Sequence, residues 1–223
     1  MSDPTVSGEP RASAPETAQT LDRGLEVLHL LSRSSGGLTV TALATALGVG
    51  RAVIYRLVAT LQARDYVIRT EDGRVRLGLG VTRLHLAVRP MLAEVATPML
   101  QALADEAGAT AHLTIAEGEQ ALAVAVVEPT WSDFHVSYRV GSRHPLSRGA
   151  AGLAILRARD GEHGLAVTSG ELQSGAHGLA VAIPDLPGLE ASVGVVALQE
   201  LGAPGVGAAV QSAAAAISAA LRG

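Results

Sequence analysis

Apolar residues recur at helical spacing through the first third of the chain and predict three helices. The first is expected over residues 20–33 and ends before Gly36-Gly37. The second follows Thr39, a suitable N-cap, and the third runs over residues 51–63, after the break at Gly48-Val49-Gly50. Two short helices joined by a glycine-bearing turn are typical of a helix-turn-helix. The apolar stripes lie at Leu21, Leu25, Leu28, Leu31, Val40, Leu43, Ala44, Leu47, Ile54, Leu57, Val58 and Leu61.

The segment after the third helix predicts a β-hairpin. Asp72-Gly73, a strong turn signal, separates two short runs in which Val67, Val75 and Leu77 can share an inner face. The tip and outer side are left to Arg69, Arg74 and Arg76. A hairpin in this place is a wing, so we expect a winged helix-turn-helix.

The remaining two thirds predict a mixed α/β domain. We expect a short helix over 81–88 ended by Pro90, a longer helix over 91–107, and a further helix after Arg148. Strands are expected over 110–116, 121–127, 134–140, 179–183 and 191–198. The chain closes with an amphipathic helix that carries Val206, Val210, Ala214, Ile217 and Leu221.

These elements predict an α+β chain of two domains. Residues 1–18 are polar and proline-rich and form a disordered tail, 19–78 the winged helix-turn-helix, 79–90 a linker helix, and 91–223 the second domain. No apolar run reaches the length of a membrane span and no signal-peptide core is present. We therefore expect no membrane partner.

Charge separates the two domains. Residues 19–90 hold ten arginines against five acidic residues, whereas residues 91–223 hold six against thirteen. A basic segment joined to an acidic one favours a nucleic-acid-binding domain beside a domain that avoids DNA, with ordinary charge scatter as the alternative.

Several kinds of chemistry find no support in the sequence. The chain has no cysteine, which excludes disulfides and fits a cytoplasmic location, and no lysine, which excludes P-loop and Schiff-base chemistry. The histidines lack metal-ligand spacing, and Ser142 and Ser147 near His144 lack the context of an activated nucleophile. We expect no enzyme, no cofactor and no metal.

Three co-linear motifs resemble the IclR family of bacterial regulators. The run from TLDRGLEVLHLL to DGRVRLG resembles its DNA-binding domain. The segment RVGSRHPLSRGAAGLAIL resembles a strand, loop and helix of its effector domain. The segment GLAVTSGELQSGAHGLAVAI resembles a later part of that effector domain. The resemblance covers the chain from about Ala18 onwards. It implies a GAF-like α/β effector domain, an operator in double-stranded DNA, a small-molecule effector, and homodimers that often pair into tetramers.

The sequence departs from the family pattern at three places. Only RARDGEH separates the helix ending near Leu156 from the later effector segment, where the family has a substantial helical segment. Gly194, Val195 and Val196 replace a polar strand, and Ala52-Val53 replaces the usual Ser-Thr pair. A shallower, less polar pocket would bind a larger, partly apolar ligand, or none, because unpaired polar ligand groups are penalised by about 1–3 kcal/mol each.

The third helix would carry the DNA contacts. We expect Arg51 to meet guanine O6 and N7, Tyr55 a phosphate or a thymine methyl, and Arg56 a phosphate, with Ala52 and Val53 beside them. Arg74 and Arg76 of the wing would reach the DNA backbone or the minor groove. The alternative is that these are ordinary solvated surface arginines.

An effector would lie at the start of the helix after Arg148. Small residues and free N–H groups there could hold a carboxylate, with arginines nearby and aromatic rings beside the apolar body. The alternatives are tight helix-on-sheet packing, surface salt bridges, and structural aromatic residues. The candidate effector residues are Trp131, Tyr138, Arg143, Arg148, Gly149, Ala150, Ala151, Gly194 and Val196.

Two functional hypotheses remain for the whole chain besides an enzyme. The first is an IclR-type regulator whose DNA binding responds to a small organic acid, apolar or aromatic in part. The second is a constitutive DNA-binding regulator whose C-terminal domain only oligomerises. We also expect at least a dimer, since 84–103 carries more apolar surface than one small domain needs.

Overall fold

A computed structural model describes residues 17–131, 138–202 and 205–223 of the chain. The chain divides into two compact units, with the boundary between His85 and Leu86. Each unit has its own core, and each is described by itself below.

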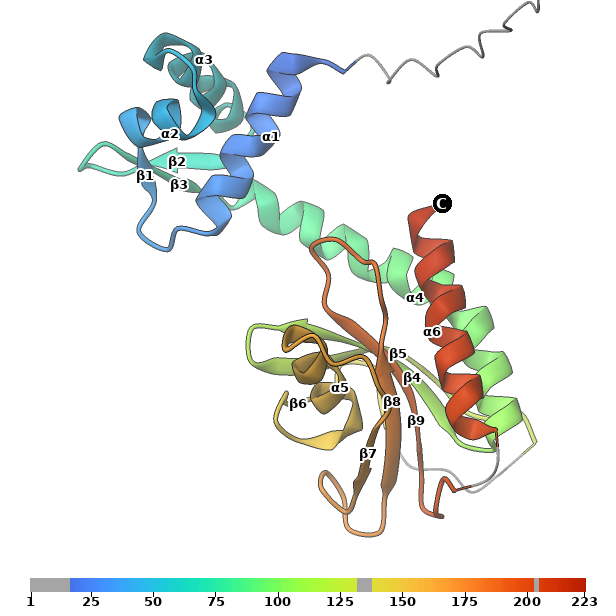
Figure 1. Ribbon diagram of the computed structural model, residues 1–223. Coiled ribbons are helices and arrows are strands. Elements are labelled where there is room, and N and C mark those ends of the chain that lie inside the picture. Colours follow the sequence, from blue (N-terminus) through green and yellow to red (C-terminus); the bar gives the residue numbers. More distant parts are fainter. Residues whose placement is uncertain (1–16, 132–137, 203–204) are drawn as a thin grey trace, which may run out of the picture. The chain divides into compact units, whose positions relative to one another are not determined.

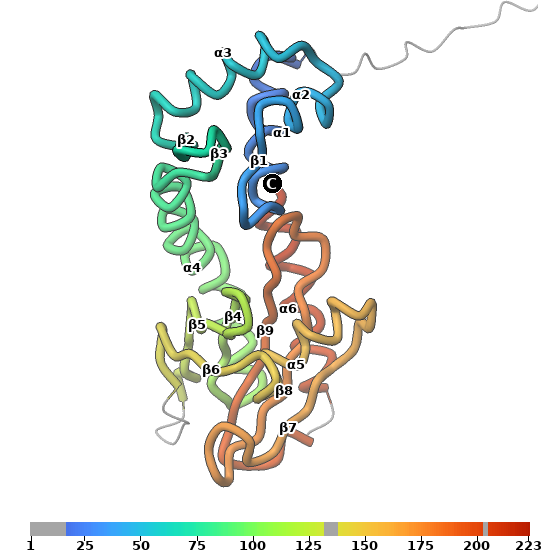
Figure 2. Tube along the Cα trace, turned by 90° about the vertical axis from the view of Figure 1, so that its left-hand side faces the viewer, coloured from blue at the N-terminus to red at the C-terminus, as the bar shows by residue number. Residues whose placement is uncertain are grey.

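The first unit is a three-helix domain with a small sheet. Helices α1 (Gln19–Ser32), α2 (Val40–Leu47) and α3 (Arg51–Gln62) pack together, and strands β1 (Leu38–Thr39), β2 (Val67–Arg69) and β3 (Arg74–Leu77) form an antiparallel sheet in the order β1-β3-β2 (Figures 1 and 2). All three predicted helices and the hairpin are confirmed. The core residues are Val27, Leu31, Val40, Leu43, Ala44, Ile54, Leu57, Val58, Val67 and Val75.

Local chemistry sets the ends of these elements. The Thr39 hydroxyl accepts a hydrogen bond from the Ala42 N–H at 3.1 Å and so caps α2, as the sequence predicted. Gly48 ends α2 in the left-handed conformation, with φ +64°, and Gly73 turns the hairpin at φ +78°. Strand β1 was not expected, because two residues show no periodicity.

The expected helix end at Pro90 is wrong. Helix α4 runs without interruption from Gly80 to Ala107 and contains both Pro90 and Pro98. Proline removes one backbone donor from a helix interior but does not always end the helix. Leu92, Ala96, Leu100 and Leu103 of α4 are buried in the core of the second unit, and this packing offsets the missing hydrogen bonds.

The second unit is built on a six-stranded antiparallel sheet in the order β6-β5-β4-β9-β8-β7. Helix α5 covers one face, and α6 lies beside α4 on the other (Figure 1). The fold is therefore mixed α+β, as predicted. The strands are β4 (Thr110–Glu117), β5 (Gln120–Val127), β6 (Arg143–Pro145), β7 (Ala166–Ser169), β8 (His177–Ala182) and β9 (Ala191–Ala197), and the helices are α5 (Gly149–Arg159) and α6 (Val206–Arg222).

Four of the five predicted strands are confirmed, as are helices α5 and α6. Of the strand expected over 134–140, residues 134–137 lie outside the described residues, and 138–140 do not form a strand. The short strands β6 and β7 were not expected, because three or four residues give too little alternation to detect.

Among the described residues, no single helix is both long enough and apolar enough to cross a membrane. In the same part of the chain, α2 and α3 taken together are long and apolar enough, but a bend of 111° separates them.

Candidate functional site: a DNA-binding face and an enclosed pocket

Helix α3 presents a polar face to solvent. Arg51, Ala52, Tyr55 and Arg56 are exposed, whereas Val53 is half-buried against the domain core. The opposite side of α3 is buried in the domain core, and this packing fixes the direction in which the exposed face of the helix points. Four of the five α3 residues predicted to contact DNA thus lie on the exposed face of the helix, and Val53 packs against the domain core.

The hairpin contributes a side chain to the same face. The Arg69 guanidinium lies over the Tyr55 ring, 5.0 Å from its centroid, in a cation–π arrangement between β2 and α3. This contact fixes the phenol relative to the hairpin. The sequence placed Arg69 on the wing, but no local pattern indicated the pairing with Tyr55.

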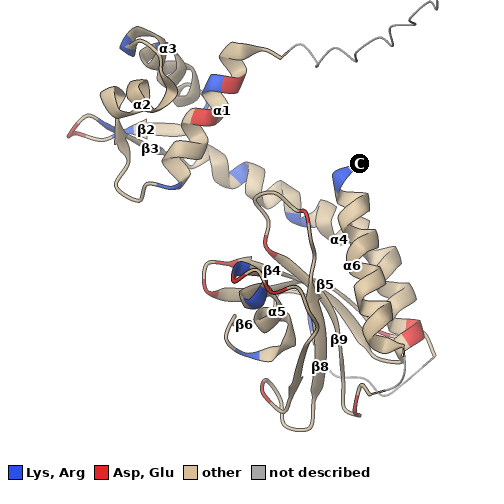
Figure 3. Cartoon of the chain, in the orientation of Figure 1, with Lys and Arg blue, Asp and Glu red and all other residues tan. Residues whose placement is uncertain are grey.

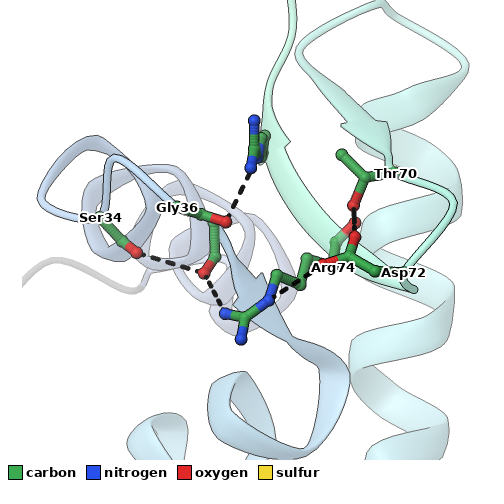
Figure 4. Close-up of polar contacts among 7 residues, drawn as sticks. Ser34, Gly36, Thr70, Asp72 and Arg74 are labelled. Carbon is green, nitrogen blue, oxygen red and sulfur yellow. Dashed lines mark hydrogen bonds and ion pairs between the residues drawn. The ribbon is translucent and has the colours of Figure 1, made fainter.

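The two other hairpin arginines are attached to the loop between α1 and β1. Arg74 donates to the Gly37 carbonyl at 3.1 Å and pairs with Asp72 at 3.2 Å, as Figure 4 shows. Arg76 Nε donates to the Gly36 carbonyl at 3.2 Å. Both side chains are exposed to solvent, and both also connect the hairpin to the loop between α1 and β1.

Charge on the first unit is mixed in sign. Arginines lie on α3, and both signs occur on α1 and at the hairpin tip (Figure 3). At the start of α3, the N-cap is Gly50, which supplies no side-chain acceptor to the first N–H groups of the helix. An N-terminus of this kind suits a phosphate.

The second unit contains a cavity of about 180 Å³ between the sheet and the start of α5. An engineered cavity of about 150 Å³ in another protein holds benzene, so this space fits a molecule of about one ring. The cavity is lined by His112, Tyr138, His144, Gly149, Ala150, Ala151, Thr168, Glu171, Leu172, Gln173, Ala176, Gly178 and Val196.

Two histidines and a tyrosine form the polar wall of this cavity. The His112 and Tyr138 rings meet edge-on with centroids 5.3 Å apart, and the Tyr138 hydroxyl lies 3.4 Å from His144 Nε2. His144 Nδ1 lies 3.1 Å from the Pro145 carbonyl, which can only accept, so Nδ1 carries a proton in this contact.

Burial keeps His112 and Tyr138 of this wall uncharged. Burial, with a smaller contribution from His144, lowers the pKa of His112 from 6.5 to about 4. Burial also raises the pKa of the Tyr138 hydroxyl. Near pH 7, His112 is therefore a neutral imidazole and Tyr138 a neutral phenol.

The loop between β7 and β8 closes over the cavity and is attached to the start of α5. The Gly149 N–H donates to the Glu171 carboxylate at 2.7 Å, and the Arg148 guanidinium donates to the Glu171 carbonyl. Leu172 packs over Gly149, where an added Cβ would lie 2.6 Å from Leu172 Cδ1. Gly149 has φ +78°, so a glycine is required there both for space and for conformation.

The structure brings together five of the nine predicted effector residues. Ala150 and Ala151 line the cavity and also pack against the sheet, which was the alternative for these residues, and their contact with an effector stays a prediction. The other residues that line it from that set are Tyr138, Gly149 and Val196.

The other four predicted effector residues lie outside the cavity lining. Trp131 is 66% exposed and its indole N–H donates to the Asp105 carbonyl. Arg143 pairs with Glu117 at 2.5 Å, and Arg148 holds the loop. Gly194 lies within the sheet, where an added Cβ would be 2.5 Å from the Leu179 carbonyl oxygen.

Eight lining residues were not anticipated. Most come from β7, β8 and the loop between them, where β7 itself was not predicted. His112 and His144 were considered as metal ligands, and His144 also as a neighbour of Ser142 and Ser147, but neither was expected to line the pocket. Among the described residues, no group of three or more acidic or histidine side chains is placed to hold a metal ion. The eight are His112, His144, Thr168, Glu171, Leu172, Gln173, Ala176 and Gly178.

The fold places the chain in a class of two-domain proteins, in which a winged helix-turn-helix unit is followed in the chain by a sheet domain with a pocket. Residues 20–71 match the family model of the IclR helix-turn-helix domain, and residues 85–163 match that of the bacterial transcriptional regulator IclR C-terminal domain. The chain belongs to the IclR family.

Relatives and solved structures agree with this assignment. The HTH-type transcriptional repressor AllR of Salmonella paratyphi A is 32% identical over 67% of this chain, but the match spans only 56% of AllR. An IclR-family protein from a Rhodococcus species shares the fold, with a TM-score of 0.63 and 23% identity over 96% of this chain and 97% of its own. An IclR homologue from Microbacterium hydrocarbonoxydans, solved with 4-hydroxybenzoate, gives a TM-score of 0.50 and 18% identity over 91% of this chain and 99% of its own.

Proposed function

We propose that the protein is a transcriptional regulator that binds double-stranded DNA through α3 and the hairpin, and whose binding responds to a small molecule in the second unit. The exposed face of α3, with Arg51, Tyr55 and Arg56 on a buried helical scaffold, carries the DNA-binding part of this proposal. The family assignment supports it. Arg51 and Ala52 would face base edges, and Arg56 and the α3 N-terminus would face phosphates.

Substitutions on α3 test this proposal. Once genomic fragments bound by the protein have been selected and sequenced, Arg51→Ala should weaken binding to the selected site by about 1–3 kcal/mol and relax one base preference. Arg56→Ala should weaken binding to all sequences alike and flatten the salt dependence, because a phosphate contact is lost. Fluorescence anisotropy measures both effects. Arg222→Ala, an exposed arginine of the second unit, serves as the control, and unchanged binding by Arg51→Ala would contradict the placement of α3.

The cavity supports an effector-responsive regulator over a constitutive one. It is partly open to solvent, lined by small and apolar residues together with polar groups, and sized for about one ring. The Microbacterium homologue binds a one-ring compound, 4-hydroxybenzoate. A ligand that binds the folded state raises its melting temperature, so a thermal-shift screen of one-ring compounds separates the two functions.

We also propose that the chain forms at least a dimer. Leu84, Val88 and Met91 lie one helical turn apart along α4 and are 54%, 41% and 43% exposed. A second copy of the chain would cover this stripe, and a two-fold dimer would place two α3 helices on successive turns of DNA. Light scattering should give a mass of two chains or more at micromolar concentration. Val88→Glu should lower that mass. Leu198→Glu, at another exposed apolar residue, should leave it unchanged. A one-chain mass for the unmodified protein would refute the proposal.

A further inference from the structure

We propose that Glu171 already occupies the acid-binding end of the pocket, so that the pocket selects an uncharged, ring-sized ligand over a carboxylate of the same shape. This inference rests on the proposed effector role of the second unit and names the ligand class for that site. It is drawn from the polar contacts around the start of α5.

Three groups suited to holding a ligand carboxylate are already bound by the chain itself. The Gly149 N–H, the first at the α5 N-terminus, donates to the Glu171 carboxylate at 2.7 Å. The Arg148 guanidinium donates to the Glu171 main-chain carbonyl. Arg143 pairs with the Glu117 carboxylate at 2.5 Å, away from the cavity lining. An incoming carboxylate that used any of these three groups would have to break the contact that the group makes within the chain.

The charges of the lining residues also disfavour binding of a ligand that carries a carboxylate. Glu171 is the one acidic residue among them, and the set includes no arginine. His112 stays neutral near pH 7, because burial lowers its pKa to about 4. A second carboxylate at the start of α5 would lie within a few ångströms of Glu171, and like charges in a partly buried site repel strongly.

The remaining polar groups suit an uncharged ligand. The hydroxyl of Thr168, a residue that is 7% exposed, and the imidazole of His112 can each donate or accept a hydrogen bond at the cavity. Ala150, Ala151 and Val196 supply an apolar surface for the ring. A hydroxyl, amide or carbonyl group on a ring of this size would find partners without adding charge.

The test compares two ligands of the same shape by isothermal titration calorimetry on the full chain near pH 7. We expect 4-hydroxybenzamide to bind the unmodified protein at least about tenfold more tightly than 4-hydroxybenzoate, the size expected for repulsion between two carboxylates at this distance. Glu171→Gln keeps an oxygen that can accept from the Gly149 N–H but removes the charge. It should strengthen binding of the acid by about tenfold and leave the amide within about twofold.

Two further variants control for effects on folding and for general charge. Glu171→Ala should show the same gain for the acid, and melting curves confirm that both Glu171 variants remain folded. Glu162→Gln removes a carboxylate from an exposed position outside the lining and should leave the ratio of the two affinities unchanged.

Several outcomes would overturn the inference. These are equal binding of acid and amide by the unmodified protein, an unchanged ratio in both Glu171 variants, or no binding of either compound by any variant. Tighter binding of 4-hydroxybenzylamine than of the amide would assign a cation to the pocket instead. DNA binding and its loss in Arg51→Ala are measured separately, so failure here is distinguishable from failure of the DNA-binding proposal.

Discussion

Gly194→Ser should lower the free energy of unfolding by about 3 kcal/mol, the upper end of the usual cost of overpacking a well-packed interior. A Cβ at position 194 would lie 2.5 Å from the Leu179 carbonyl oxygen and 2.6 Å from Ala180 Cβ. The nearest atom belongs to the backbone of a central strand, so a side-chain rotation cannot relieve the clash. Chemical denaturation followed by circular dichroism measures the effect.

Gly164→Ser is the matched control for Gly194→Ser. A Cβ at position 164 meets no atom within 4 Å, and that residue has an ordinary φ, so the substitution should change stability by less than about 0.5 kcal/mol. Equal stabilities for the two variants would show that β8 and β9 move apart more easily than the structure indicates. A serine at position 194 would therefore disturb the sheet rather than restore the polar strand of the family pattern.

Acid should destabilise the protein through His112. The folded state holds this residue neutral with a pKa of about 4, whereas the unfolded chain takes up a proton near 6.5. The unfolded state therefore binds more protons between these values, and stability should fall as the pH is lowered from about 6.5 to 4. The full shift of the His112 pKa corresponds to a loss of about 3 kcal/mol in the free energy of unfolding.

The difference between the unmodified protein and His112→Gln isolates this contribution. Other groups also titrate, including Asp105 and Glu190, whose pKa values are lowered by hydrogen bonds from Thr130 and Arg159 respectively. Urea unfolding at half-unit pH steps should give a variant whose stability changes less with pH. Parallel stability curves for the two proteins would mean that His112 takes up its proton in the folded state, against the burial seen here. His144 and Tyr138, the titratable groups that face His112, are present in both proteins. Thr114, whose hydroxyl lies 3.3 Å from His112 Nδ1, does not titrate.

Most helices and the longer strands could be predicted from the sequence, because periodicity depends on which residues are buried. The apolar stripes of α2 and α3 and the turn at Gly73 are local signals, and the structure confirms them. Helix α4 was different, since local rules end a helix at Pro90 and only long-range packing of Leu92 and Leu100 maintains it. Strands β6 and β7 are held by their neighbours in the sheet, which the sequence does not reveal.

The candidate pocket was predicted only in part for the same reason. The small residues at the start of α5 were identified from their composition. The partners of the charged residues were not, because Glu171 lies 22 positions from Gly149 and Glu117 lies 26 positions from Arg143. Such pairs depend on which loops and strands the fold brings together.

The contacts of the wing arginines imply an exchange of hydrogen-bond acceptors in the proposed complex with DNA. The Gly36 carbonyl that Arg76 holds is uncharged, and a phosphate forms a stronger, charge-assisted hydrogen bond with a guanidinium. Arg76 can therefore move from the protein backbone to a DNA backbone with a net gain. Arg74 would also have to give up its ion pair with Asp72, so of the two it is the one more strongly retained by the protein.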